Sequence, residues 1–336
     1  MKQYPKVSII IVNWNGREHL RYSLPSLSKI DYPNYEIILV DNNSTDSSLE
    51  FVRNNYPQIK IIKNTANLGF AQGNNLGIRQ AAGKYVLFLN NDTKVKPDFL
   101  TKLVSGLESE PDIGAVQSKI LLMDRPKFLD SIGSFLTWTG FLTHFGFLKK
   151  NEPRLNKKIE IFSAMGVCLL VRRDVLEKVG FFDKDFFAYF EETDLCWRIW
   201  LAGYKILYIS EAVIYHKKGA TSSLLPNSFI TYHSFKNRIC SLIKNLELKN
   251  LMWMLPIHLV ICKLVALGYF LKGKPRNSLS IFRALGWNLV NFKSTLTKRK
   301  TVQNKIRKIS DSLLLPRISR KISLTNYWQL WQEINI

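Results

Sequence analysis

The chain has 336 residues, of which 46% are hydrophobic, so it can bury a large core and does not have the composition of a disordered protein. Its formal net charge is +22, but the excess is uneven: residues 229–336 hold 19 Lys and Arg against 3 Asp and Glu, and residues 1–228 hold 29 against 23. The basic last third predicts an anionic partner, either a membrane leaflet or nucleic acid. Because no zinc-finger or RNA-recognition signature accompanies it, we expect a membrane surface and no nucleic acid.

Four cysteines are spread along the chain without a CxxC pair or a histidine-rich cluster: Cys168, Cys196, Cys240 and Cys262. This spacing predicts neither a disulfide framework nor a structural zinc site, and it fits a reducing compartment. The first five residues lead directly into a β-like run and lack the apolar stretch of a secretory signal. We therefore expect the chain to act in the cytoplasm.

Short runs that are continuously apolar and β-branched predict buried parallel strands. In chain order they cover residues 7–12, 36–40, 59–62 and 85–89. Helical patterns alternate with them, over residues 18–30, 47–54 and 70–82. Pro25 inside the first helical pattern predicts a kink or a split helix, and Gly83 is a candidate C-cap of the third. The alternation predicts a right-handed, doubly wound, mostly parallel α/β sheet.

The pattern is less regular farther along the chain. Residues 120–158 mix glycine, aromatic residues and lysine without clear periodicity, which favours an insertion over the sheet. Residues 162–171 predict a further strand. Within it, Ser163, Ala164 and Gly166 are small enough to let a ligand approach closely.

Polar residues follow three of the predicted strands: Asn13, Trp14 and Asn15 the first, Asp41 the second, and Asn91 and Asp92 the fourth. Sheets of this kind bind ligands at the carboxyl ends of their strands, so we expect these groups to converge on one site. Asp41 could hydrogen-bond a base or a ribose, and Trp14 could stack on the base. Asp41 could equally cap a helix that begins near Thr45.

Two residues are candidate ligands of a metal ion. Asp92 would offer an oxygen to a hard cation such as Mg²⁺, which often uses one or two protein carboxylates beside substrate phosphates. His216 follows the strand-like AVIYH and could complete the same metal shell. The alternatives are an ordinary turn aspartate and an ordinary structural histidine.

Three acidic residues, Glu191, Glu192 and Asp194, stand where an aromatic run becomes a helical pattern. The helix dipole stabilises negative charge in the first turn, so these residues could serve the helix alone. The aromatic residues before them favour a partly dry site that suits acid/base catalysis.

Six ordered segments carry a family resemblance: VSIIIVNWNG, VDNNSTDSS, NLGFAQGNNLGI, LFLNNDT, FFAYFEETDLCWR and YHKKGATS. Together they resemble family 2 of the inverting glycosyltransferases, in particular its rhamnosyltransferase-like bacterial members. The resemblance covers about residues 5–240. It implies the glycosyltransferase A-type fold, a nucleoside diphosphate sugar as donor, a divalent cation (Mg²⁺ or Mn²⁺), and a saccharide or polyprenyl-linked acceptor.

The same resemblance implies a nucleotide pocket lined by Trp14, Asp41, Asn67, Asn74 and Asn91, a metal at Asp92 and an acceptor-side base at Glu192. The chain departs twice from the commonest pattern, because Asn90-Asn91-Asp92 replaces a more acidic triplet and Glu191-Glu192 replaces Glu-Asp. The second departure leaves the base open between Glu191 and Glu192.

We therefore expect an inverting sugar transferase in which Glu192 takes the acceptor proton and a metal at Asp92 stabilises the departing diphosphate. Rhamnose on thymidine diphosphate is the first expectation for the donor, and a polysaccharide or polyprenyl-linked oligosaccharide for the acceptor. A nicotinamide-dependent oxidoreductase is an alternative, but the first turn, NWNGREHL, lacks GxGxxG. A non-enzymatic, basic membrane- or nucleic-acid-binding protein is another.

Two regions are expected: a catalytic domain at residues 1–228, and a basic, apolar, helical appendage at residues 229–336 that associates with the membrane. Residues 251–271 are long enough to span a bilayer. Lys263 lies inside that run and would cost on the order of 3 kcal/mol on insertion scales, so we favour a helix lying in the interface. The protein would then be peripheral or monotopic at the inner face of the cell membrane. The alternative is a helical subdomain packed on the sheet.

Overall fold

The structure is a computed structural model that describes residues 4–219 and 225–321. Its strands are β1 (Val7–Asn13), β2 (Tyr35–Asp41), β3 (Lys60–Lys63), β4 (Tyr85–Leu89), β5 (Thr93–Val95), β6 (Ile113–Leu122), β7 (Leu129–Ser131), β8 (Gly133–Leu136), β9 (Leu142–Phe145), β10 (Ile159–Glu160), β11 (Cys168–Arg172) and β12 (Lys205–His216). Its α-helices are α1 (Arg17–Leu27), α2 (Ser48–Asn55), α3 (Gly69–Gln80), α4 (Phe99–Glu108), α5 (Arg173–Val179), α6 (Glu191–Leu201), α7 (Asn227–Asn245), α8 (Leu248–Leu271), α9 (Pro275–Val290), α10 (Phe292–Thr301) and α11 (Asp311–Ile318).

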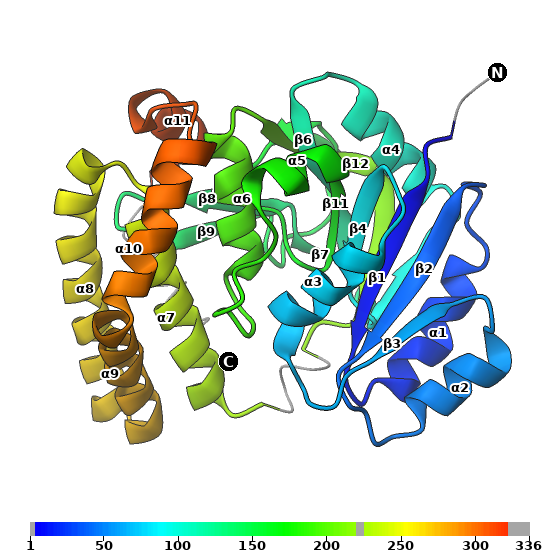
Figure 1. The fold of residues 1–336 in the computed structure, drawn as a ribbon, viewed down its shortest axis with the longest axis horizontal. Helices are drawn as coiled ribbons and strands as arrows, with labels where there is room; N and C mark the ends of the chain where they lie inside the picture. The colour runs from blue at the N-terminus through cyan, green and yellow to red at the C-terminus, as the bar shows by residue number, and fades with distance from the viewer. Residues whose placement is uncertain (1–3, 220–224, 322–336) are drawn as a thin grey trace.

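The main sheet has the strand order β10-β12-β6-β11-β4-β1-β2-β3 (Figure 1). The strands β1 to β4 are parallel to their neighbours among themselves, and so are β6 and β12. The chain passes from β1 to β2 and β3 on one side and then returns to β4 on the other side of β1. The topological switch point therefore lies between β1 and β4, and ligands bind outside the carboxyl ends of strands at such a point.

Helices cover both faces of the sheet, which confirms the predicted doubly wound, mostly parallel fold. Ile9 and Ile11 of β1 belong to the core beneath α1, α2 and α4. Ile10 points to the other face and belongs to the core beneath α3, α5 and α6. A strand that is buried on both faces needs an apolar side chain at every position, and this is why its sequence is apolar without alternation.

Two local predictions about the first helices are corrected. The helix α1 is a single element, because Pro25 lies in its last turn and the helix ends at Leu27, before the predicted end. Gly83 does not cap α3, which ends at Gln80. A Cβ on Gly83 would lie 2.6 Å from the peptide nitrogen of Ser8, so the glycine instead allows the chain to pass close to β1.

The later part of the sheet also differs from expectation. Residues 120–158 are not a plain insertion: β6 continues to Leu122 within the sheet, β7 pairs with β6, and β8 and β9 form a separate hairpin. The strand predicted at residues 162–171 begins only at Cys168, and β11 runs antiparallel to both β4 and β6. The residues before it follow an irregular path, in which the peptide N–H of Ser134 donates to Ser163 O at 2.8 Å.

The helices from α7 onward form a bundle at one end of the sheet (Figure 1). The first of them, α7, packs on α6, α9 and α10, and α8 packs mainly on α9. The boundary predicted at residue 228 therefore falls in the first turn of α7. Among the described residues, α8 is the one helix long and apolar enough to cross a membrane, with a mean hydropathy of 1.9.

Candidate functional site

The polar residues that end β1 and β4 meet at the switch point. Asn91 Nδ2 donates to Asn13 Oδ1 at 2.8 Å, and both side chains are buried. Gly16 is needed here, because a Cβ on it would lie 2.2 Å from Asn91 Nδ2. The structure thus brings together the polar clusters that follow the first and the fourth strand, as the strand pattern predicts.

Asp41, at the end of β2, joins the same network. Asn13 Nδ2 lies 3.2 Å from Asp41 Oδ1, 3.1 Å from Ser44 Oγ and 3.0 Å from Ser48 Oγ. The Asp41 carboxylate also accepts hydrogen bonds from the Ser44 peptide N–H at 3.0 Å and from its hydroxyl at 2.5 Å. Asp41 therefore stabilises the turn after β2. It does not cap α2, because Asp46 Oδ1 accepts the Ser48 peptide N–H at 3.1 Å.

Trp14 and Asn15 lie just beyond β1. Trp14 is half-buried and Asn15 is exposed. Asn15 Oδ1 accepts the peptide N–H of Thr45 at 2.7 Å, so this asparagine ties the first strand end to the turn after β2.

The side chains of Asn67, which precedes α3, and of Asn74, which lies within it, hydrogen-bond the backbone of this helix. Asn67 Oδ1 accepts the peptide N–H of Gly69 at 2.9 Å, and Asn74 Nδ2 donates to Phe70 O at 2.9 Å. Both asparagines support the start of this helix in the structure. Their contact with a nucleotide stays a prediction.

Asp92 and His216 are far apart in sequence but adjacent in the fold. The strands β5 and β12 pair antiparallel and place His216 opposite Thr93, so His216 Nε2 lies 3.3 Å from Asp92 Oδ1. On its other side, His216 Nδ1 is 2.6 Å from Asp130 Oδ2. Burial lowers the pKa of His216, but the hydrogen bond with Asp130 and the negative charges of Asp92 and Asp130 outweigh burial and raise it to about 9. A cation bound at Nε2 would therefore displace a proton.

This arrangement fits a divalent cation. Asp92 Oδ1 is buried without a hydrogen bond, beside an imidazole whose second nitrogen is fixed by Asp130. Histidines that bind a metal ion usually have their second ring nitrogen held by a carboxylate in this way. Among the described residues no group of three His, Cys, Asp or Glu forms a ready metal site. A cation held by Asp92 and His216 would therefore need phosphate oxygens as further ligands, as Mg²⁺ often does.

Glu191 and Glu192 begin α6, directly after the cap residue Phe190. Glu191 is buried and its Oε2 has no hydrogen bond; burial, with a contribution from Glu192, raises its pKa well above the usual range. Glu192 is half-buried, and burial raises its pKa to about 7, although peptide N–H groups at Glu192 and Thr193 act in the opposite direction. Both carboxyl groups thus have an environment that favours the neutral form.

A short segment connects Glu192 with the strand end that carries Asp92. A Cβ on Gly166 would lie 3.9 Å from Glu192 Cβ, so the glycine backbone is close to the acid. The next residue, Val167, accepts the peptide N–H of Asn90 at 3.0 Å. The candidate base and the candidate metal ligand therefore border the same region of the fold.

Asp194, the third acidic candidate, contacts side chains of α6 and α7. Its carboxylate is fully buried and faces α7, where Lys244 Nζ lies at 3.0 Å, Ser241 Oγ at 3.1 Å and Asn245 Nδ2 at 2.9 Å. Arg198 Nε approaches it at 3.1 Å from within α6. These contacts are all made within the protein. Asp194 is two residues after Glu192, which places it on a different side of the helix from Glu192.

Asp130 is the functional candidate that sequence reasoning missed. It lies in β7, inside residues 120–158, where no periodicity marks a strand. A single aspartate in such a stretch carries no signal of its own. Only the pairing of β7 with β6 brings it to His216.

The chain is similar to known proteins both in sequence and in structure. The model of glycosyl transferase family 2 matches residues 8–180. The O-antigen biosynthesis protein RfbC of Myxococcus xanthus is 29% identical over 228 residues, which are 65% of this chain and 18% of that protein. The N-acetylglucosaminyl-diphospho-decaprenol L-rhamnosyltransferase of Mycobacterium tuberculosis is 26% identical over 250 residues, which are 67% of this chain and 80% of that protein.

The fold agrees with these matches. The crystal structure of GalNAc-T7 with UDP, GalNAc and Mn²⁺ superposes with a TM-score of 0.59 at 18% identity, covering 73% of this chain and 48% of that chain. The chain thus spans about a fifth of the length of RfbC and about half of GalNAc-T7. The family model covers more than half of the chain. The chain therefore belongs to glycosyl transferase family 2 and has the glycosyltransferase A-type fold.

Proposed function

We propose that the chain is an inverting transferase that moves a sugar from a nucleoside diphosphate to an acceptor hydroxyl. The observation that carries this proposal is the pair of Asp92 Oδ1 and His216 Nε2, 3.3 Å apart at the switch point, with Glu192 across the 166–167 segment. This arrangement would suit a diphosphate-bound cation next to a carboxylate of raised pKa. Neither a nicotinamide site nor a purely binding role requires that combination, so both alternatives are less well supported than the family match.

Asp92 and His216 would hold Mg²⁺ or Mn²⁺ together with the diphosphate, and Asp130 would keep the His216 ring in place. The cation would supply charge stabilisation to the departing diphosphate. The network of Asn13, Asp41 and Asn91 forms the floor beneath the nucleotide. Trp14, half-buried beside this floor, would stack on the base.

Glu192 is proposed as the general base. With a pKa near 7, it is about half deprotonated at neutral pH and is a better proton acceptor than an ordinary carboxylate. Glu191 is more deeply buried, and burial together with the charge of Glu192 raises its pKa well above the usual range, which favours its neutral form. This difference favours Glu192 over Glu191, an ambiguity that the sequence leaves open.

The donor and the acceptor are proposed from the mycobacterial relative, whose name describes a rhamnosyltransferase acting on a lipid diphosphate. We infer thymidine diphosphate rhamnose as the donor and a polyprenyl-linked saccharide, or a growing polysaccharide, as the acceptor. Such an acceptor would be presented at a membrane.

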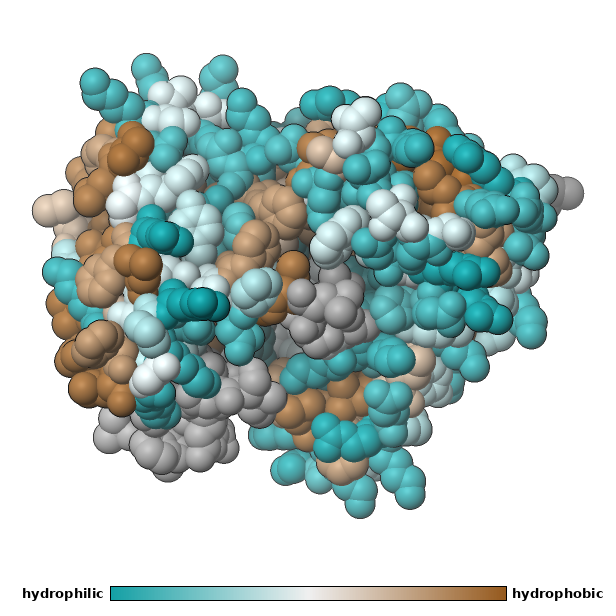
Figure 2. Space-filling view, turned by 90° about the horizontal axis from the view of Figure 1, so that it is seen from below, coloured by the Kyte–Doolittle hydropathy of each residue, from teal (hydrophilic) through white to brown (hydrophobic). Residues whose placement is uncertain are grey.

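The C-terminal helices offer a surface for that membrane. Large apolar side chains on α8 and α9 are at least 40% exposed: Met252, Trp253, Val260, Leu264, Leu267, Phe270, Leu271, Leu279, Phe282, Leu289 and Val290. Hydrophobic residues gather along the end of the molecule formed by these helices (Figure 2). No Asp or Glu stands between Glu247 and Asp311 in the sequence, so this apolar face is bordered only by basic charge. We propose that it binds the anionic cytoplasmic leaflet.

The packing of α8 favours a helix that lies on the membrane over one that crosses it. His258 is fully buried, its Nδ1 lies 2.8 Å from Thr139 O, and its ring centroid lies 4.4 Å from that of Phe141. Cys262 and Ala266, one and two turns farther along, are also fully buried. A spanning helix would have to leave these contacts, whereas an interfacial helix keeps them and presents its exposed side to lipid.

A thermal-shift screen of the purified chain tests the proposed donor. Each nucleotide sugar is added with Mn²⁺ or with EDTA, and NAD serves as the probe for the oxidoreductase alternative. A ligand at 100 times its Kd stabilises the folded state by about 2.7 kcal/mol. We expect the largest metal-dependent shift with thymidine diphosphate rhamnose. No metal-dependent shift with any nucleotide sugar, or a shift with NAD alone, would contradict the proposal.

A further inference from the structure

The segment of residues 180–190 joins α5 to α6 and leads directly into Glu191 and Glu192. One side of it is fixed to α3. The peptide N–H of Phe70 donates to Phe187 O at 2.7 Å, and the Asn75 side chain donates to Phe182 O at 2.9 Å and accepts the Phe182 N–H at 3.0 Å. The 180–190 segment therefore contacts α3, the helix that contains Asn74, which is expected to line the nucleotide pocket.

The end of this segment has an unusual backbone. Tyr189 and Phe190 have φ angles of +68° and +71°, in the left-handed region that residues other than glycine rarely adopt. Phe190 is the cap of α6, so these two residues determine the direction in which Glu191 and Glu192 leave the segment. Backbone conformations of this kind persist only where neighbouring groups hold them.

Side chains of the C-terminal helix α7 stabilise this backbone conformation. Asn237, which is fully buried, donates through Nδ2 to Ala188 O at 3.0 Å and to Tyr189 O at 2.6 Å. Lys236 Nζ donates to Asp185 O at 2.5 Å. The peptide groups next to the left-handed residues are thus fixed by side chains from the C-terminal bundle.

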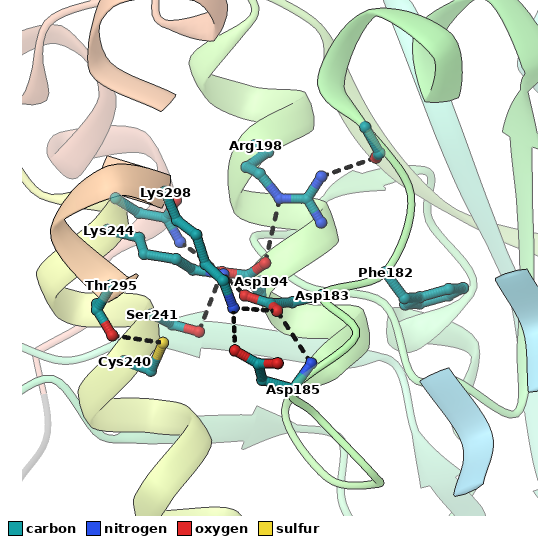
Figure 3. Close-up of polar contacts among 12 residues, drawn as sticks. Phe182, Asp183, Asp185, Asp194, Arg198, Cys240, Ser241, Lys244, Thr295 and Lys298 are labelled. Atoms are coloured by element: carbon teal, nitrogen blue, oxygen red, sulfur yellow. Dashed lines mark hydrogen bonds and ion pairs between the residues drawn. The ribbon is translucent and has the colours of Figure 1, made fainter. Parts of the chain in front are cut away.

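A buried cluster of charges fixes the middle of the segment (Figure 3). Asp183 accepts Lys244 Nζ from α7 at 2.6 Å and Lys298 Nζ from α10 at 2.5 Å. Lys298 also lies 2.6 Å from Asp185 Oδ2. Lys244 continues to Asp194 of α6 at 3.0 Å, so the cluster connects the segment, α6, α7 and α10.

Because this cluster is buried, its net contribution to the stability of the fold is small. The side chains of Asp183 and Lys244 are 6% and 4% exposed, and the cost of removing such charges from water offsets most of their attraction. Apolar residues of similar size in place of these charges would stabilise the fold equally well. Ion pairs and hydrogen bonds add direction, however, because they are satisfied in one arrangement only. Their direct effect is on the position of the 180–190 segment.

We propose that Lys298 and Asn237 are positioning residues of the transfer reaction. Through Asp183, Asp185 and the left-handed pair Tyr189 and Phe190, they hold α6 so that the Glu192 carboxylate faces the acceptor hydroxyl. The inference rests on the proposed role of Glu192. It also makes the C-terminal bundle part of the catalytic unit, in addition to its proposed contact with the membrane.

The variant Lys298→Ala tests this inference in the full chain. We expect kcat to fall about 10- to 100-fold, the effect of a small misplacement of a catalytic group, with the donor KM nearly unchanged. The acidic limb of the pH profile should move, because the surroundings of Glu192 change. Lys298→Arg keeps the charge and should restore most of the activity. Lys300→Ala is the matched control, because Lys300 lies on the same helix, carries the same charge and is exposed.

Hydrogen exchange measures how firmly the 180–190 segment is held in place, independently of activity. Amides of residues 181–190 should exchange faster in Lys298→Ala and in Asn237→Ala than in the wild type, while those of β1 and β4 stay protected. Lys298→Ala with wild-type kcat and pH profile would overturn the inference, and so would unchanged exchange in both variants. A wild-type chain that transfers no sugar from any donor would instead overturn the proposed function.

Discussion

His216 Nε2 lies 3.3 Å from Asp92 Oδ1, and His216 Nδ1 lies 2.6 Å from Asp130 Oδ2. The imidazole therefore bridges two carboxylates that belong to different parts of the sheet. Each carboxylate keeps one buried oxygen without a hydrogen bond, Asp92 Oδ1 and Asp130 Oδ1. Asp130 differs from Asp92 because its other oxygen is hydrogen-bonded to the His216 ring and fixes its orientation. These two roles predict different effects of substitution.

Asp92→Ala should abolish the effect of metal on nucleoside diphosphate binding and leave the fold intact, because the proposed cation loses its carboxylate ligand. Asp130→Asn should weaken metal-dependent binding by about 10- to 100-fold only, the usual effect of a lost outer-shell partner. Calorimetry of thymidine diphosphate with and without Mn²⁺ measures both. Unchanged metal dependence in Asp92→Ala would move the cation to other ligands.

Glu192→Gln should lower kcat by a factor of about 10² or more with donor affinity nearly unchanged, because the amide keeps the shape but cannot accept the proton. Glu191→Gln is the matched control and should retain most activity. The assignment is wrong if the control is the inactive variant.

The pH dependence of the wild type follows from the same residue. The pKa of Glu192 is raised to about 7, and only the ionised form acts as a base, so kcat/KM should fall as the pH decreases below about 7. An acidic limb near pH 4.5, the ordinary value for glutamate, would show that a different group or a less buried carboxylate controls the rate. Initial rates between pH 5 and 9 at saturating Mn²⁺ measure this limb.

Glu191 should make the protein less stable as the pH rises. Its pKa in the folded state lies above the unfolded value of 4.5, so its contribution to stability is complete below about pH 4.5 and is lost as the pH increases through the folded pKa. Glu191→Gln removes this loss. The difference in Tm between the variant and the wild type should therefore grow from pH 4.5 to pH 8.5, as measured by calorimetry. A difference independent of pH would mean that Glu191 is not buried in the neutral form.

The sequence predicts the first half of the fold better than the second. The strand β1 is buried on both faces, and its run of apolar residues identifies it without ambiguity. The strand β11 follows an irregular segment that is also apolar, so composition alone places its start too early. Its antiparallel direction depends on how far the preceding loop returns, which no local pattern records.

The site shows a similar division. The polar ends of β1 and β4 are predictable, because parallel strands bring their carboxyl ends to one edge. The partnership of Asp130 with His216 is not, because it depends on a three-residue strand. Asp194 was expected beside Glu192 because the two are near in sequence, but a helix turns its residues in different directions, and Asp194 faces Lys244.

The last prediction concerns the exposed apolar face of α8 and α9. Leu264 and Phe282 are 60% and 50% exposed, so replacing both with glutamate should not disturb the core. At an anionic leaflet, each well-placed Lys or Arg contributes roughly 1 kcal/mol, screened by salt, and the apolar face adds burial in the headgroup region. Two glutamates would oppose both contributions. The wild type should therefore sediment with liposomes that contain phosphatidylserine, less so at high salt, and the double variant should stay in solution.

Trp138→Glu is the matched control, because Trp138 is 51% exposed but lies between β8 and β9. Point variants are preferable to a chain that ends near residue 245, because such a truncation also removes Lys298 from the cluster around Asp183. If the double variant sediments as well as the wild type, this face is not the membrane contact, and the exposed apolar residues serve another partner.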